Sequence, residues 1–166
     1  MQNIFRSQWF DKVDPLITGW MNRHGLLLLR ISVGIIFFWF GVLKFFPGIS
    51  PAQELAIRTI TTITFDLLPE TLIINGLALW EVLIGLGLIT GRLMRETLLL
   101  LFLQMPGTFL PVFLFPAEVF AQTPFVPTLE GQYIFKNLVL ITAGIVIGGS
   151  LHKQRKTSAE QSATIN

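Results

Sequence analysis

Four long runs of apolar residues follow one another along the chain, separated by shorter and more polar segments. They extend from Leu26 to Phe46, from about Leu72 to Gly91, from about Glu96 to Phe115, and from about Tyr133 to Leu151. Each is close to the ~20 residues that a helix needs to cross a bilayer. The pattern predicts an all-α fold, an integral membrane four-helix bundle.

The loop after the first run is predicted to hold a short helix of its own. Ser50-Pro51-Ala52-Gln53 is a capping-box pattern with proline at the first helical position. The helix should continue through Leu55, Ile60 and Ile63 and end before Pro69. We expect it to lie at the outer interface of the membrane or to pack as an extracellular cap.

The pattern divides the chain into a membrane domain, residues 26–151, and two flanking segments. Residues 1–25 are expected to form a cytoplasmic or interfacial segment, since Trp9, Phe10 and Trp20 suit a membrane interface, with Pro15 as an interruption. Residues 152–166 are rich in Ser, Thr, Ala and Gln and are expected to form a disordered cytoplasmic tail.

Composition supports a membrane location and limits the kinds of metal and redox site that the chain can form. The chain is 52% hydrophobic and 13% charged, with a mean hydropathy of +0.65, whereas soluble domains are about 25% charged. It has no cysteine and two histidines, so disulfides, thiolate metal sites and iron–sulfur clusters are excluded and a metal or haem site is not expected. The chain lacks the dense basic face of a nucleic-acid-binding protein.

Lysine and arginine are distributed unevenly between the two sides of the predicted bundle. One side receives Arg6, Lys12, Arg23, Arg92, Arg95, Lys153, Arg155 and Lys156, whereas the opposite loops contain Arg58. Because cytoplasmic loops carry the excess of basic residues, both termini are predicted to be cytoplasmic. Segments 47–71 and 116–132 are then outside.

Several polar residues fall inside the apolar runs and define a predicted intramembrane polar site: Arg30, Lys44, Glu81, Gln104, Thr108, Lys136 and Asn137. A charge that faces lipid at mid-depth costs about 2.5–3.5 kcal/mol, so Glu81 should face the bundle interior, either paired or protonated. Counting residues from the inner edge separates Arg30 and Glu81 by ~7–8 Å in depth, and we expect these two to pair.

Structural roles are the alternative for each of these residues. Arg30 and the two lysines can extend their side chains to the headgroups, and Glu81 can form a bond that only fixes helix packing. Gln104, Thr108 and Asn137 are typical of interhelical hydrogen bonding. Three aromatic residues, Phe37, Trp80 and Tyr133, are candidates for lining a flat ligand, with ordinary bundle or lipid packing as the alternative.

Two of the apolar runs carry strings that resemble DoxX-type membrane proteins. The first extends from Arg30-Ile-Ser-Val-Gly34 through Phe40-Gly41-Val-Leu-Lys44-Phe-Phe-Pro-Gly48, and the second from Glu81-Val-Leu-Ile-Gly85 to Gly91-Arg92. The segment from Pro127 to Asn137 is similar to the start of the fourth helix in one bacterial branch. The resemblance covers about Leu26 to Gly149 and implies a four-helix, multi-pass protein of the bacterial inner (plasma) membrane.

The resemblance implies no single activity. Some members resemble the small subunit of a thiosulfate:quinone oxidoreductase, others are linked to oxidative-stress complexes with soluble redox enzymes, and distant relatives act as membrane chaperones. Our main hypothesis is a membrane subunit of a quinone-linked redox system, with a quinone or small substrate near Arg30, Glu81 and Lys136. Since the chain has no covalent redox group, electrons would need a bound quinone or a partner's cofactor.

Two other function classes stay open. The chain can be a non-enzymatic membrane scaffold or chaperone, whose polar residues serve folding and partner choice. A small-solute permease is less favoured, because four spans without a duplicated half do not suit alternating access. The expected partners are the lipid bilayer and either a soluble redox enzyme or a second copy of the chain.

Overall fold

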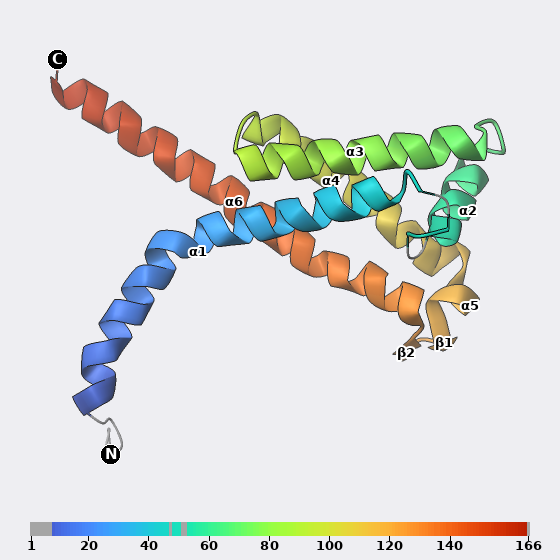
Figure 1. Ribbon diagram of the computed structural model, residues 1–166, viewed down its shortest axis with the longest axis horizontal. Helices are drawn as coiled ribbons and strands as arrows, with labels where there is room; N and C mark the ends of the chain where they lie inside the picture. The colour runs from blue at the N-terminus through green and yellow to red at the C-terminus, as the bar shows by residue number, and fades with distance from the viewer. Residues whose placement is uncertain (1–7, 47, 51–52, 166) are drawn as a thin grey trace.

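A computed structural model describes residues 8–46, 48–50 and 53–165, with side chains from Val13 to Leu151 within these ranges. The described chain is helical apart from one small hairpin (Figure 1). Its elements are α1 (Gln8–Leu43), α2 (Gln53–Ile63), α3 (Glu70–Thr90), α4 (Met94–Leu114), α5 (Pro116–Val119), β1 (Phe120–Gln122), β2 (Val126–Pro127) and α6 (Leu129–Ile165). The two strands pair antiparallel. The prediction of an all-α fold is confirmed.

Within the described residues, four helices are long and apolar enough to cross a membrane. They are Val13–Leu43 of α1, all of α3, all of α4, and Leu129–Leu151 of α6. These are the four runs predicted from the hydropathy pattern. The chain therefore has the makeup of a multi-pass membrane protein, and the short helix expected in the first outer loop is present as α2.

The first and last helices, α1 and α6, extend further than the sequence predicts. α1 begins at Gln8 and passes through Pro15, where we expected an interruption; proline removes one backbone hydrogen bond without ending the helix here. α6 remains helical through Ile165, where we expected a disordered tail. Its last residues include Lys, Gln, Arg, Ala and Glu, which are good helix formers, and no glycine or proline follows Gly149.

Helices α1 and α3 lie side by side in antiparallel directions (Figure 1), and glycines allow the close approach. A β-carbon added at Gly34 would come within 2.9 Å of the Ile89 side chain, and one at Gly41 within 2.8 Å of the Val82 nitrogen. In return, Gly85 faces the backbone of Phe38. Small residues at helix contacts are typical of membrane bundles, because backbones can then pack directly.

This register places the end of α1 halfway along α3. Gly41 lies against Glu81 and Val82, and Glu81 is eleven residues after the start of α3 at Glu70, or about 16 Å at 1.5 Å per residue. Beyond the end of α1, the short helix α2 lies across the bundle (Figure 1). Helix α2 packs there against α3 and α4.

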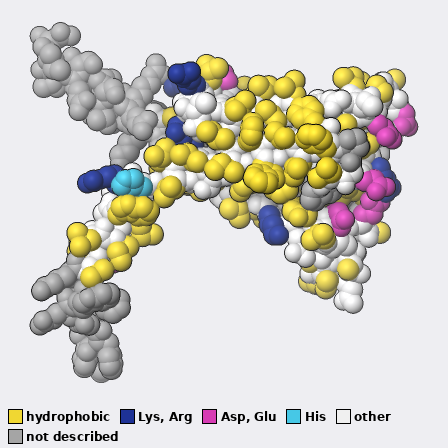
Figure 2. Space-filling model, viewed as in Figure 1, with side chains coloured by type: hydrophobic (Ala, Val, Ile, Leu, Met, Phe, Trp, Pro, Cys, Tyr) yellow, Lys and Arg dark blue, Asp and Glu magenta, His cyan; other side chains and the backbone are white. Residues whose placement is uncertain are grey.

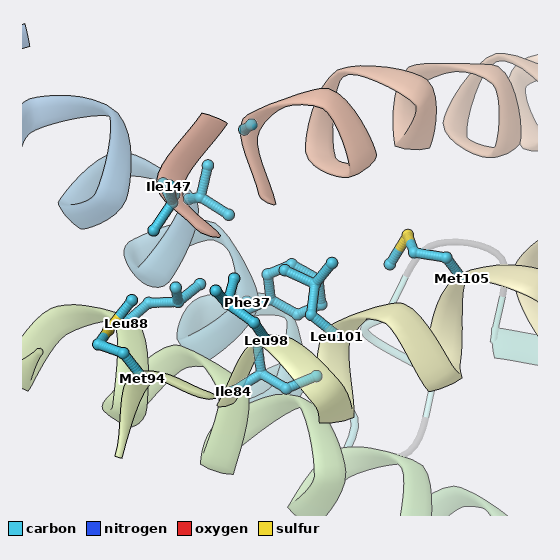
Figure 3. Packing of buried hydrophobic residues seen from close by; sticks show 10 residues of the cluster. Phe37, Ile84, Leu88, Met94, Leu98, Leu101, Met105 and Ile147 are labelled. Atoms are coloured by element: carbon cyan, nitrogen blue, oxygen red, sulfur yellow. The ribbon is translucent and has the colours of Figure 1, made fainter. Parts of the chain in front are cut away.

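The four long helices meet in one buried apolar cluster. α1 contributes Phe37, α3 contributes Ile84 and Leu88, α4 contributes Leu101, and α6 contributes Ile147 (Figure 3). A second, smaller cluster joins the outer elements through Leu55, Val119 and Ile134. The polar residues of the membrane domain must therefore lie beside these clusters.

Candidate functional site

The polar site is built around Glu81, whose carboxylate is bonded from two other helices. Lys44 Nζ lies 2.6 Å from Glu81 Oε2, and Gln104 Nε2 donates to Glu81 Oε1 at 2.9 Å. The side chains of Lys44 and Glu81 are only 10% and 11% exposed. We call Lys44, Glu81 and Gln104 the polar cluster; it connects α1, α3 and α4.

The position of Lys44 follows from the early end of α1. Lys44 comes directly after the last residue of α1, and its Nζ lies 3.5 Å from the Phe40 carbonyl oxygen. A cation at the C-terminal end of a helix is favoured by the unpaired carbonyls and the helix dipole. Lys44 reaches Glu81 because α1 stops opposite the middle of α3.

Two groups of the polar cluster keep unused hydrogen-bonding capacity. Within the described residues, the buried Gln104 Oε1 has no hydrogen-bond partner. A lysine ammonium has three N–H donors, and the contacts of Lys44 with Glu81 and the distant Phe40 carbonyl leave a further donor. The polar cluster therefore has one unpaired acceptor, Gln104 Oε1, and one further donor on Lys44 Nζ.

The expected pairing of Glu81 with Arg30 is wrong. The Arg30 guanidinium packs against Gly91, in the turn between α3 and α4, ten residues beyond Glu81. That is about 15 Å along the helix. The count of residues from the inner membrane edge failed because it took Leu26 as the first residue of the helix. The glycine contacts set how far α1 and α3 are actually shifted along each other. Arg30 thus lies against the turn after α3, and this turn and the start of α4 also carry Arg92 and Arg95, consistent with the alternative of an interfacial side chain.

The remaining predicted polar residues lie outside the cluster. Lys136 is exposed and sits over the Tyr133 ring, with Nζ 5.4 Å from its centroid. Thr108 donates to the Met105 carbonyl of its own helix. The half-buried Asn137 makes no side-chain hydrogen bond with any described residue. These three residues therefore do not extend the polar cluster.

The three aromatic candidates have different surroundings. Phe37 is buried in the central apolar cluster, which favours the packing interpretation. Tyr133 makes an edge-on contact with Phe40, at 6.5 Å between ring centroids, and so joins α6 to the end of α1. Trp80 Nε1 donates to the Leu100 carbonyl at 3.0 Å, and so connects α3 to α4 one residue from Glu81.

Replacing Trp80 with phenylalanine should lower the free energy of unfolding by about 0.5–1.5 kcal/mol, the usual net contribution of one hydrogen bond. Phenylalanine keeps an aromatic, apolar side chain, although a smaller one, but the Leu100 carbonyl loses its indole donor. Reversible unfolding in mixed micelles measures the change. An unchanged stability would show that the bond between α3 and α4 contributes nothing.

Sequence analysis missed an acidic cavity at the end of the bundle where α2, α5 and the start of α6 meet. It has a volume of about 780 Å³, and four carboxylates line it: Glu54, Glu70, Glu118 and Glu130. Arg58 forms an ion pair with Glu118 and stacks 4.7 Å from the Phe115 centroid. Figure 2 shows acidic side chains gathered at one end of the molecule. The available signal was the excess of glutamate in the predicted outer loops.

The cavity adjoins the segment that carries the polar cluster. Gly48 and Ser50, which line it, follow Lys44 in the chain. Within the described residues, no group of three or more His, Cys, Asp or Glu side chains is arranged to hold a metal ion.

The chain was compared with protein-family models, with curated proteins and with solved structures. None of these comparisons gives a match. The expected resemblance to DoxX-type proteins therefore depends on the sequence strings alone, those around Arg30, Lys44 and Glu81 and the segment from Pro127 to Asn137.

Proposed function

We propose that this chain is a DoxX-like multi-pass protein of the bacterial inner membrane, with both termini in the cytoplasm, and that it is the membrane subunit of a quinone-linked redox or oxidative-stress system. The hydropathy pattern and the excess of lysine and arginine on one side support the location. The motifs around Arg30, Lys44 and Glu81 support the family.

The observation that carries the redox proposal is the unpaired Gln104 Oε1 beside a buried ion pair at mid-height of α3. A quinone has carbonyl oxygens that can accept a hydrogen bond from the free N–H donor of Lys44. The quinol has hydroxyl groups that can donate to Gln104 Oε1. Quinone reduction consumes protons, and Glu81 can carry one proton on its carboxyl group. The same groups therefore suit both redox forms of the head group.

Electrons must come from elsewhere. The chain contains no cysteine and, within its described residues, no metal-holding group. A soluble partner with its own cofactor would supply them. The protein's own part is to position the head group and to exchange a proton at Glu81.

Analysis of what remains bound after gentle purification tests this proposal. The protein is extracted from its own membranes in mild detergent without oxygen, and lipids and polypeptides that co-purify are identified. We expect a quinone to be retained by the wild type and by Gln122→Leu, whose side chain is exposed on β1, and to be lost from Gln104→Leu. Equal melting temperatures of the two variants exclude unfolding as the cause.

A folded wild type without quinone would overturn the redox proposal. Equal quinone content in both leucine variants would overturn the role of Gln104. Recovery of a soluble redox enzyme with the wild type would support the subunit assignment.

A second candidate, a non-enzymatic scaffold or chaperone, is favoured by one observation. Both carboxylate oxygens of Glu81 are already bonded within the chain, as in a purely structural ion pair. This candidate predicts that Glu81→Gln changes stability and partner recovery, while no quinone is found in any sample.

A further inference from the structure

The N-terminal part of α1 presents an apolar face that no other described element covers. We call residues 13–25 the N-terminal arm. In Figure 1 this part of α1 turns away from the bundle. A β-carbon added at Gly19 or Gly25 would meet nothing within 4 Å. Neither glycine therefore contacts α3 or α6.

The arm is amphipathic at helical spacing. At about 100° per residue, one face of the helix carries Val13, Leu16, Ile17, Trp20 and Met21. The last four of these are between 53% and 75% exposed. Asp14, Thr18 and Asn22 lie toward the opposite face. Helices with such faces bind in the plane of a membrane interface, with the apolar face toward the acyl chains.

The part of this apolar face around Ile17 continues the lipid-facing side of α1, whereas Leu16, eighteen residues before Gly34, lies at the angle of the side that faces α3 in the bundle. Ile17, Leu28 and Ile35 are eleven and seven residues apart, which places them within about 20° of one another on the helix. Leu28 and Ile35 are 47% and 48% exposed in the apolar span. The residues that face α3, Gly34 and Gly41, lie on a different side. The lipid expected around this side of the span can thus also cover the arm.

The polar groups of the arm are arranged for a membrane interface. Thr18 Oγ1 donates to the Asp14 carbonyl within the same helix. Trp20 stacks on His24 at 5.1 Å between ring centroids, and both side chains are amphipathic, as interfacial aromatics are. Arg23 is exposed where the arm meets the span, a position that favours contact with anionic headgroups.

The apolar helix Val13–Leu43 has 31 residues, more than the ~20 that cross a bilayer. We infer that its N-terminal arm lies in the interface of the membrane that holds the bundle, with Ile17 and Trp20 toward the acyl chains and Thr18 and Asn22 toward water. The occupant of this face is lipid. This inference is independent of any redox role.

Single-cysteine variants test it, because the chain has no cysteine of its own. Ile17→Cys, Thr18→Cys, Met21→Cys and Asn22→Cys are spin-labelled and reconstituted in vesicles of phosphatidylethanolamine and phosphatidylglycerol. Ile35→Cys, in the lipid-facing span, is the reference. Label accessibility is measured toward oxygen, which concentrates in lipid, and toward a water-soluble nickel chelate.

We expect oxygen to dominate at positions 17 and 21, as at position 35, and the preference to invert at positions 18 and 22. Equal nickel access at all four arm positions would place the arm in water and overturn the inference. Protection of positions 17 and 21 from both reagents, with dipolar broadening between labels, would assign the face to a second copy and would also overturn it.

Discussion

Replacing Glu81 with glutamine will lower the free energy of unfolding by about 3–5 kcal/mol, the usual effect of removing one partner from a buried ion pair. The amide can still bond to Gln104, but the Lys44 ammonium loses its counter-charge while its side chain remains 10% exposed. Reversible unfolding of the purified protein in mixed micelles measures the difference.

Two control variants distinguish the effect of leaving a buried charge without its partner from the effect of simply removing a carboxylate. Glu118→Gln removes the acidic partner of the Arg58–Glu118 pair, whose side chains are 49% and 39% exposed, and should cost less than about 1 kcal/mol. The double variant Lys44→Met/Glu81→Met removes both charges, so most of the loss should be recovered. If Glu81→Gln lowered the free energy of unfolding no more than Glu118→Gln does, the buried pair would not hold α1 to α3.

The membrane spans were predictable because the bilayer imposes a length and an apolar composition on any helix that crosses it. The inward direction of Glu81 was predictable for the same reason, because a charge that faces lipid is costly. Glu81 and Gln104 were both placed in the predicted polar site, and their side chains do meet. These inferences need only the local pattern of each helix.

The partner of Glu81 was not predictable in this way, because it depends on how far α1 and α3 are shifted along each other. Glycine contacts at positions 34, 41 and 85 fix that shift, and they bring Lys44, not Arg30, to the carboxylate. Residue counts from the edges of apolar runs cannot supply such a register. The acidic cavity was missed for a related reason, since residues of the 48–58 segment, Glu70 at the start of α3, and residues of the 117–130 segment line it together.

The second large effect is expected at Gly85, where α3 contacts the backbone of α1. A β-carbon there would lie 2.7 Å from the Phe38 Cα, so Gly85→Ala must push the helices apart, at a cost of about 1–3 kcal/mol. Gly76 in the same helix has nothing within 4 Å of a β-carbon. Gly76→Ala should therefore stabilise the protein by about 0.5–1 kcal/mol through helix propensity.

The two large effects should be coupled, because Gly85 lies one helical turn from Glu81 on the same face of α3. Separating α1 from α3 at Gly85 also separates Lys44 from Glu81, so part of the cost of Gly85→Ala is loss of the ion pair. A double-mutant cycle measures this share. Gly85→Ala should cost less in the Lys44→Met/Glu81→Met background than in the wild type. Strictly additive costs would mean that the glycine contact and the ion pair hold the two helices independently.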